Sequence, residues 1–371
     1  MLRRSTRDFL AKECSPKVVR KLMEGSGYDA AMWKKIADLG WTALGIPEEY
    51  GGAGTFLDLV VVLEEAGRAL LPGPFFATMG LAVPAILEAG TEAQKKEALG
   101  AIAQGSARAT LAFTEPSGRW DAGSVSLKAT RAGGGWKLEG VKLFVPDAGV
   151  ADYTVVVART RGDGRPRSED EDGITLFLVK GRPAGMTVNP LETLDMTRRW
   201  GEIRFDDVQL GDDAVMGAPN KAWPHLKRAL EQSTAALCAE MVGGVQKVLE
   251  TSTDYAKTRQ QFGKPIGIYQ AVSHKLADML VLSESGRSAT YYAAWAVDAD
   301  APDRSLASSM AKAYVSDAYR KVAGDGIQVH GGIGFTWEHD MHLYFKRAKS
   351  SEVTLGDATY HRELVAQALD L

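Results

Sequence analysis

Cysteine is scarce in this sequence, and long apolar runs are missing altogether. Cys14 and Cys238 stand far apart, which indicates two reduced thiols rather than a disulfide framework or a zinc site. No run of about 18 apolar residues is present, and the N-terminal segment MLRRSTRDFLAKEC has no apolar stretch of the signal-peptide type. We therefore expect a cytoplasmic protein that does not enter a membrane.

Neither sign of charge dominates the chain. It carries 44 lysine and arginine residues against 47 aspartate and glutamate residues, which leaves a net charge of −3. This balance gives no electrostatic reason to expect a nucleic-acid partner. Among the six histidines, His339 and His342 are three positions apart, but they stand in an amphipathic segment where solvated roles are commoner than metal binding. The sequence therefore predicts neither nucleic-acid binding nor a metal site.

Hydrophobic periodicity changes twice along the chain and predicts three domains, at residues 1–108, 109–215 and 216–371. In the first region apolar residues recur at helical spacing, as in LDLVVVLEEAGRALL at residues 57–71. In the second region this spacing gives way to an alternation of apolar and polar residues that is typical of strands. The helical period then returns and continues to the end.

The alternating region predicts a small antiparallel barrel or sandwich. Three glycines at 133–135 indicate a hairpin turn, and the polar segment RGDGRPRSEDEDG at 161–173 indicates a mobile loop between two strands. The expected strands are 110–114, 125–131, 136–143, 153–160, 174–180, 186–190 and 202–210.

The last region begins near Lys221 with one apolar stripe that predicts a helix of roughly 35 residues. Further helices are expected over 270–299 and 305–322. Long apolar helices with short connections are typical of a four-helix bundle that also packs against other subunits. The sequence as a whole predicts an α+β fold with an N-terminal helical domain, a central antiparallel β-domain and a C-terminal four-helix bundle.

Chemistry-bearing side chains concentrate in YAKTRQQFGKPIGIYQ, at residues 255–270, where one helix ends and the next begins. Arg259 offers a planar fork for phosphate oxygens, Phe262 offers a stacking surface, and Gln270 offers a bidentate amide. The alternative is an ordinary surface turn with a solvated arginine. Taken alone, this segment does not decide between the two.

Four motifs in order resemble the acyl-CoA dehydrogenase family of flavoproteins. They are GIPEEYGGAG (45–54), TEPSGRWD (114–121), RQQFGKPIGIYQ (259–270) and QVHGGIGF (328–335). The resemblance implies that FAD lies between the β-domain and the bundle. It also implies α,β-dehydrogenation of an acyl-CoA thioester, with a carboxylate that removes the α proton and FAD that accepts the β hydrogen as hydride. Electrons would pass to an electron-transfer flavoprotein.

The same resemblance implies a cofactor contact across a subunit interface. Arg259 would meet the pyrophosphate of the neighbour's FAD, and Phe262 would lie on its adenine side. A second patch would approach the cofactor closely because glycine has no Cβ. The alternative is that the glycines only make a turn and the glutamines cap helices. The matching positions are Arg259, Phe262, Gln270, Gln328, Gly331 and Gly332.

The contacts that a subunit makes to its own flavin match less completely. Thr114, with Phe113 beside it, matches the residue that binds the pyrimidine end of the ring, and Phe144 replaces the usual Trp as an apolar plate. Pro146 replaces a hydroxyl residue and has neither a side-chain hydroxyl nor an N–H. Trp120 replaces a small Ser whose neighbourhood, in the family, contacts the cofactor and the CoA pyrophosphate. A Trp there would either reshape or block that passage.

The usual catalytic carboxylate is absent. Leu355 stands at the position of the family's Glu, and Ser233 stands at the position used by other members. The candidate bases are Asp357, which has a short side chain, and Glu240, which lies in an apolar helix segment. Glu240 could instead form a salt bridge to a bundle Lys or Arg, because a buried Glu is costly unless it is paired or functional. Glu231 and Glu352 are further candidates.

Two interpretations follow. In the first, the chain is an active dehydrogenase whose base has moved to Asp357 or Glu240. In the second, it is the base-less subunit of a heteromeric enzyme and completes a partner's FAD site, similar to bacterial members that act in pairs on steroid or other bulky acyl-CoAs. Both imply an acyl-CoA substrate and either a homo-oligomer or a heterotetramer with a related subunit. A nucleic-acid-associated branch of the family is disfavoured by the near-neutral charge.

Overall fold

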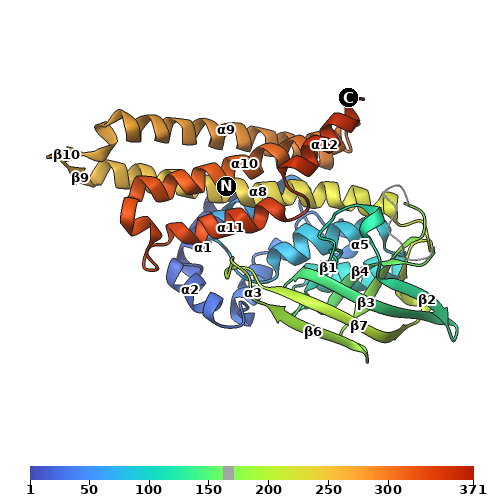
Figure 1. The fold of residues 1–371 in the computed structure, drawn as a ribbon. Helices are drawn as coiled ribbons and strands as arrows, with labels where there is room; N and C mark the ends of the chain where they lie inside the picture. The colour runs from blue at the N-terminus through green and yellow to red at the C-terminus, as the bar shows by residue number, and fades with distance from the viewer. Residues whose placement is uncertain (162–170) are drawn as a thin grey trace. The chain divides into compact units, whose positions relative to one another are not determined.

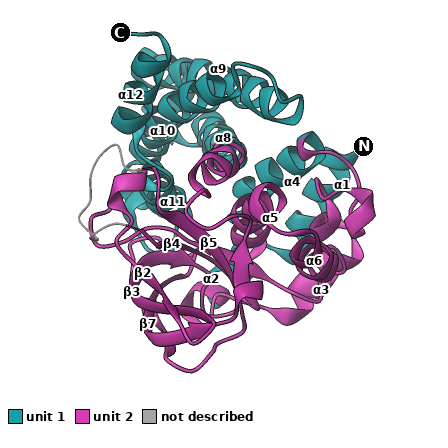
Figure 2. Cartoon of the chain, turned by 90° about the vertical axis from the view of Figure 1, so that its right-hand side faces the viewer, with its two compact units in different colours: residues 1–21, 57–71, 234–371 teal, residues 22–56, 72–233 magenta. Residues whose placement is uncertain are grey.

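The computed structural model describes residues 1–161 and 171–371, which form two compact units (Figure 1, Figure 2). Unit 1 comprises residues 1–21, 57–71 and 234–371, and unit 2 comprises residues 22–56 and 72–233. Most of the polar loop expected at 161–173 lies outside the described residues. Both units combine segments that are distant in the sequence, and the three domain boundaries expected from periodicity remain a prediction.

Unit 2 contains a sheet of eight strands in the order β6-β7-β3-β2-β4-β5-β8, with β1 beside β4. Most neighbours pair antiparallel, but β1 and β2 pair in parallel with β4. The central β-domain is thus confirmed, whereas the two-residue β8 is not foreseen because two residues carry no periodicity. The strands are β1 (Ala109–Ala112), β2 (Lys128–Ala132), β3 (Gly135–Pro146), β4 (Tyr153–Arg159), β5 (Ile174–Lys180), β6 (Met186–Leu191), β7 (Trp200–Leu210) and β8 (Val215–Met216).

The core of the sheet is aromatic and aliphatic. Trp136 on β3 meets Phe177 on β5 edge to face at a centroid distance of 5.6 Å, and both rings are buried. Gly133 and Gly134 have positive φ between β2 and β3, which confirms the expected hairpin turn. The helices of this unit are α3 (Ala30–Asp38), α5 (Val83–Ala89), α6 (Glu92–Gln94) and α7 (Gly100–Ala103), preceded along the chain by α2 (Pro16–Glu24).

Unit 1 is helical. Its longest helix, α8, has 36 residues, of which 223–233 belong to unit 2, and this length confirms the helix of roughly 35 residues expected from the apolar stripe. Helix α10 packs along α9, and Figure 1 shows α8 and α9 joined by a short turn. The helices are α1 (Leu2–Glu13), α4 (Phe56–Arg68), α8 (Trp223–Thr258), α9 (Gln270–Asp298), α10 (Arg304–His330), α11 (Met341–Val353) and α12 (Ala358–Ala368).

Two glycines let α4 and α8 touch backbone to backbone. A Cβ on Gly67 would lie 1.8 Å from the carbonyl oxygen of Glu240, and one on Gly243 would lie 1.7 Å from that of Glu64. Any side chain at either position would force the helices apart, because interiors are close-packed. This crossing fixes the place of Glu240, one of the candidate bases.

Helix α4 also carries two buried carboxylates, and both are neutralised within unit 1. Glu64 accepts hydrogen bonds from Arg287 of α9 at 3.1 Å, and it pairs with Arg3 of α1 at 2.8 Å. Glu65 pairs with Arg7 of α1 at 2.8 Å. Buried carboxylates need such partners. Both carboxylates are therefore structural, and the catalytic base must be sought among other residues.

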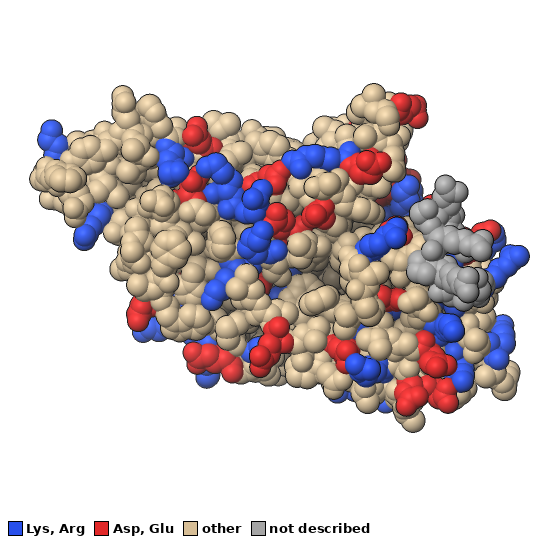
Figure 3. Space-filling view, in the orientation of Figure 1, with Lys and Arg blue, Asp and Glu red and all other residues tan. Residues whose placement is uncertain are grey.

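Basic and acidic side chains are interspersed on the face shown in Figure 3, in keeping with the small net charge. None of the helices in the described ranges has the length and apolar character needed to span a bilayer. No group of three or more metal-binding side chains is arranged around a common point in residues 1–161 and 171–371.

Candidate functional site

The corner between α8 and α9 is a tight hairpin. Strands β9 (Gln260–Gln261) and β10 (Lys264–Pro265) pair antiparallel across a two-residue turn. Both turn residues, Phe262 and Gly263, have positive φ, of 53° and 76°. Turns of this kind favour Asn-Gly, and a bulky residue in the first position carries strain of roughly 1–2 kcal/mol. Strained backbone concentrates at functional sites, so the phenylalanine is the unusual feature of this corner.

The ring of Phe262 is 91% exposed. Its neighbour in the fold is Tyr269, whose ring lies edge-on at 6.3 Å and whose hydroxyl donates to the carbonyl of Gln261 at 3.1 Å. An aromatic ring that is held in a strained turn and exposed to water lacks the burial through which aromatic side chains normally stabilise a fold. The corner therefore leaves this ring exposed to solvent, although the backbone beneath it is strained.

Polar groups near the same corner are also free. The guanidinium of Arg259 and the side-chain amides of Gln270 and Gln328 are exposed and make no hydrogen bond with any residue that the structure describes. Tyr269 is the N-cap of α9, and that helix start has no side-chain cap bond, so Gln270 does not cap it. These groups match an anionic, planar ligand better than they match a role in helix capping.

A stack of rings brings the second patch to this end of unit 1. Tyr255 near the end of α8 lies on His330 at the end of α10, with centroids 4.5 Å apart and planes 28° apart. His330 donates from Nδ1 to the carbonyl of Gly326 at 2.7 Å, and burial lowers its pKa. The segment after it, η8 (Gly331–Phe335), opens with two glycines. A Cβ on Gly331 or Gly332 would meet nothing within 4 Å.

In unit 2 the candidate residues Phe113 and Thr114 follow β1 directly. Lys142 of β3, fully buried, donates to the carbonyl of Phe113 at 3.0 Å and to the carboxylate of Glu115 at 2.6 Å. Burial alone would raise the pKa of Glu115, but Lys142 and the hydrogen bonds to this carboxylate hold it below its usual value. The buried pair fixes the backbone on both sides of Thr114.

The far end of β3 carries the other two positions that the sequence singled out. Phe144 sits at a β-bulge with a φ of 50°, and its ring is 50% exposed. Pro146 pairs with Trp200 of β7, and its carbonyl accepts a hydrogen bond from the hydroxyl of Thr110 at 2.6 Å. The proline thus ends the strand and offers no donor of its own. Phe144 remains available as an apolar plate.

The turn between α11 and α12 carries Leu355, which is buried and has a φ of 61°. Gly356 follows with a φ of 95°, and a Cβ there would lie 2.2 Å from the ring of Tyr360. A β-unbranched residue other than glycine in the left-handed region is uncommon and marks a constrained position. The turn therefore carries a buried leucine, and not a carboxylate, at this position.

Two residues that the sequence did not single out hold this turn. Lys312 of α10, fully buried, donates to the carbonyls of Glu352 and Gly356 at 3.0 and 2.8 Å. His361 of α12 donates from Nε2 to the carbonyl of Leu355 at 2.9 Å. Burial lowers the pKa of Lys312 to about 8. A lysine inside the apolar stripe of a long helix was the signal that could have identified the first of them.

Asp357 is exposed and is the N-cap of α12. Its carboxylate accepts a hydrogen bond from the backbone N–H of Tyr360 at 2.8 Å. Aspartate is among the preferred residues at this position because the side chain satisfies an otherwise unpaired donor. The geometry explains Asp357 without catalysis, and a role as base remains a prediction.

Glu240 is paired rather than free. Its carboxylate lies 2.6 Å from the guanidinium of Arg347 on α11, and both side chains are almost fully buried. The salt bridge weighed against catalysis is therefore confirmed, and this pairing disfavours Glu240 as a base, because protonation would remove the negative charge that faces the buried guanidinium of Arg347. Of the remaining candidates, Glu352 pairs with Lys349 at 2.6 Å and with Arg320 at 3.2 Å, and Glu231 is half-buried on α8.

The buried His361 should make the free energy of unfolding depend on pH. Burial, aided by Lys312, lowers the pKa of His361 to about 4, against about 6.5 in an unfolded chain. Between pH 6.5 and 4 the unfolded state binds a proton that the folded state does not, so the free energy of unfolding falls by about 3 kcal/mol. Urea unfolding at pH 7 and pH 4.5 should show that the wild type loses about 2–3 kcal/mol more than His361→Gln, because the other buried histidines lower the stability of both proteins equally. An equal loss in both proteins would contradict it.

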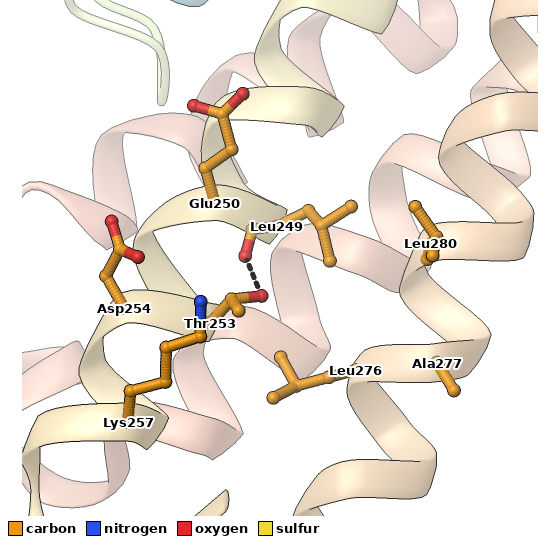
Figure 4. A pocket seen from close by; sticks show the side chains of 8 residues that line it. All are labelled: Leu249, Glu250, Thr253, Asp254, Lys257, Leu276, Ala277 and Leu280. Carbon is orange, nitrogen blue, oxygen red and sulfur yellow. Dashed lines mark hydrogen bonds between the residues drawn. The ribbon is translucent and has the colours of Figure 1, made fainter.

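A groove of about 600 Å³ lies between α8 and α9 (Figure 4). Leu249 and Leu276 point into the space between the helices, and Thr253 donates back to the carbonyl of Leu249 at 2.8 Å. Glu250 at its edge is bonded to Arg68. None of the candidate FAD contacts or candidate bases lines this groove, so its geometry does not extend the candidate site.

Three family models match the chain in succession. They are described as the acyl-CoA dehydrogenase N-terminal domain (residues 1–106), middle domain (110–208) and C-terminal domain (220–369). Among curated proteins, acyl-CoA dehydrogenase IpdE2 of Mycolicibacterium smegmatis is 33% identical over 362 residues, covering 96% of this chain and 94% of that protein.

Solved structures are similar over the full length. Butyryl-CoA dehydrogenase from Megasphaera elsdenii gives a TM-score of 0.91 at 27% identity, covering all of this chain and 97% of that one. A variant of the Tcur3481-Tcur3483 steroid ACAD gives 0.88 at 29% identity, covering all of this chain and 96% of that one. The similarity is therefore global and includes both units.

Proposed function

Because the chain belongs to the acyl-CoA dehydrogenase family, we propose that it acts as one subunit of a heteromeric dehydrogenase whose catalytic carboxylate lies on a related partner chain. The function that follows from the family is FAD-dependent α,β-dehydrogenation of an acyl-CoA thioester. The observation that carries the finer proposal is Leu355, which is buried in the base's position while Glu240 is locked in an ion pair.

The exposed corner fits FAD. A guanidinium with no partner among the described residues suits a pyrophosphate, and the ring of Phe262 suits an adenine face. The open backbone at Gly331 and Gly332 leaves room for a close ligand. When bound, FAD accepts the β hydrogen of the thioester as hydride. In this proposal Arg259, Phe262, Gln270 and Gln328 hold the cofactor of the partner chain.

A second surface of unit 1 supports assembly. Tyr292 and Trp295 of α9 are each 49% exposed with ring centroids 5.7 Å apart, and Met310 and Tyr314 of the neighbouring α10 are exposed as well. Exposed aromatic and apolar side chains gathered on packed helices mark a protein interface. We assign this surface to contact with another subunit of the same family.

The substrate of this subunit's assembly is proposed to be a bulky acyl-CoA. Support comes from its similarity to a steroid ACAD and to IpdE2. An electron-transfer flavoprotein is the proposed acceptor, since electrons must leave the reduced flavin after each turnover. The alternative function is a dehydrogenase that uses its own Asp357 as base.

The test separates the two functions at Asp357. Asp357→Asn keeps the cap, because Asn caps a helix as well as Asp does, but it cannot accept a proton. In an assembly with a related subunit that has an intact Glu-Gly-Thr, we expect this variant to reduce flavin with acyl-CoA as fast as wild type. Changing the partner's Glu to Gln should remove the activity.

Asp357→Ala is the matched control, since it removes the cap together with the carboxylate. It should lower thermal stability without stopping flavin reduction. Loss of reduction in Asp357→Asn, with a normal melting temperature, would overturn the proposal and establish Asp357 as the base.

A further inference from the structure

Phe113 of unit 2 is covered by two tryptophans. Its ring is 3% exposed. Trp120 lies on it with centroids 5.3 Å apart and planes 25° apart, and Trp223 at the start of α8 lies 6.3 Å away at 33°. All three rings belong to one compact unit. Aromatic contacts of this geometry are favourable beyond the area they bury, so the ring of Phe113 is satisfied by protein.

The segment that carries Trp120 is tied to the sheet. Arg159 of β4, itself buried, donates to the carbonyl of Ala122 at 2.6 Å and to that of Val125 at 2.8 Å. Ser124 donates to the carbonyl of Asp121 at 2.6 Å. These bonds begin one residue after the indole and fix the backbone that carries it. Trp120 is therefore held in place and is not a freely moving surface side chain.

The same surface is where a subunit's own flavin would need space, beside Phe113 and Thr114. We propose that Trp120 is a plug: it fills this half-site with an indole, so that the chain does not retain an FAD of its own. This inference rests on the proposed function, in which the chain serves the partner's cofactor. To make room, a flavin would have to displace a stacked ring from Phe113.

A second difference from the family pattern, also in unit 2, likewise disfavours the binding of a flavin there. Pro146 at the end of β3 has no N–H and no hydroxyl, so it offers no donor to a flavin ring. Phe144 alone keeps an exposed ring at that end of the strand. The corner in unit 1 stays open while the half-site in unit 2 is filled. Trp120 by itself would account for the difference between the open corner in unit 1 and the filled half-site in unit 2.

The experiment measures FAD binding by the chain alone. Wild type and Trp120→Ser are mixed with FAD and gel-filtered. Flavin per chain is read from absorbance, and the Kd from quenching of flavin fluorescence. We expect wild type to leave the column nearly colourless and Trp120→Ser to bind FAD at least about tenfold more tightly. The conservative variant Trp120→Phe keeps a ring on Phe113 and should stay colourless.

Two results would overturn the plug. One is wild-type chain that retains about one FAD per chain without a partner, a result that stands even if Trp120→Ser does not fold. The other is a folded Trp120→Ser, verified by circular dichroism, whose FAD affinity equals that of wild type. Neither result bears on the source of the catalytic carboxylate, because Asp357→Asn tests that separately in the assembled enzyme.

Discussion

Replacing Phe262 with asparagine should stabilise the isolated chain by about 1 kcal/mol and at the same time weaken FAD binding in the assembled enzyme at least tenfold. The gain arises because Asn adopts positive φ more readily than Phe, and Asn-Gly is the preferred pair in this two-residue turn. The loss arises because the exposed ring is the stacking surface that the corner presents. Urea unfolding and flavin content measure the two effects.

Phe262→Tyr is the control, since it keeps a ring in the same strained position. It should bind FAD as wild type does and should unfold at the wild-type urea concentration. Opposite effects on stability and binding are the signature of a residue retained for a partner at a cost to its own fold. An Asn variant that keeps full flavin content would show that the ring does not contact the cofactor.

Breaking the Glu240–Arg347 pair should strongly destabilise unit 1. Both groups are almost fully buried, and removing one partner of a buried ion pair costs about 3–5 kcal/mol because the remaining buried charge loses this counter-charge. Glu240→Gln should therefore lower the free energy of unfolding by about 3 kcal/mol or more. Denaturant titration measures this loss.

The double change Glu240→Met with Arg347→Met removes both charges and should recover most of that stability, because apolar pairs of similar volume often replace buried ion pairs without loss. The double variant also tests catalysis. If it folds and its assembly reduces flavin at the wild-type rate, Glu240 is structural. A stable double variant with no flavin reduction would instead identify Glu240 as the base.

Sequence reasoning succeeded where the signal is local or repeated. The apolar stripe of α8 is periodic over its whole length, and the short apolar run ITLFLVK marks β5 at its observed bounds. It did not foresee the parallel pairing of β1 and β2 with β4, because pairing partners are chosen by the whole sheet rather than by one strand's pattern.

Side-chain partners were beyond sequence reasoning for the same physical reason. Glu240 and Arg347 stand more than 100 positions apart, and only the packing of α8 and α11 brings them to 2.6 Å. In the sequence, Lys312 does not differ from other helix residues. In the fold, the turn at Leu355 places two carbonyl oxygens at its ammonium group. Contacts of this kind depend on tertiary geometry that no local pattern encodes.

The sequence by itself determined the class of fold, the family and the chemical character of the corner, because motifs and periodicity are written in adjacent residues. It also showed that Leu355 replaces a carboxylate. Only the tertiary structure decided how those residues are engaged: Phe262 stands in water, Glu240 is paired, Asp357 caps a helix and Trp120 lies on Phe113. Exposure and pairing are properties of packing, and packing is settled between segments that are distant in the chain.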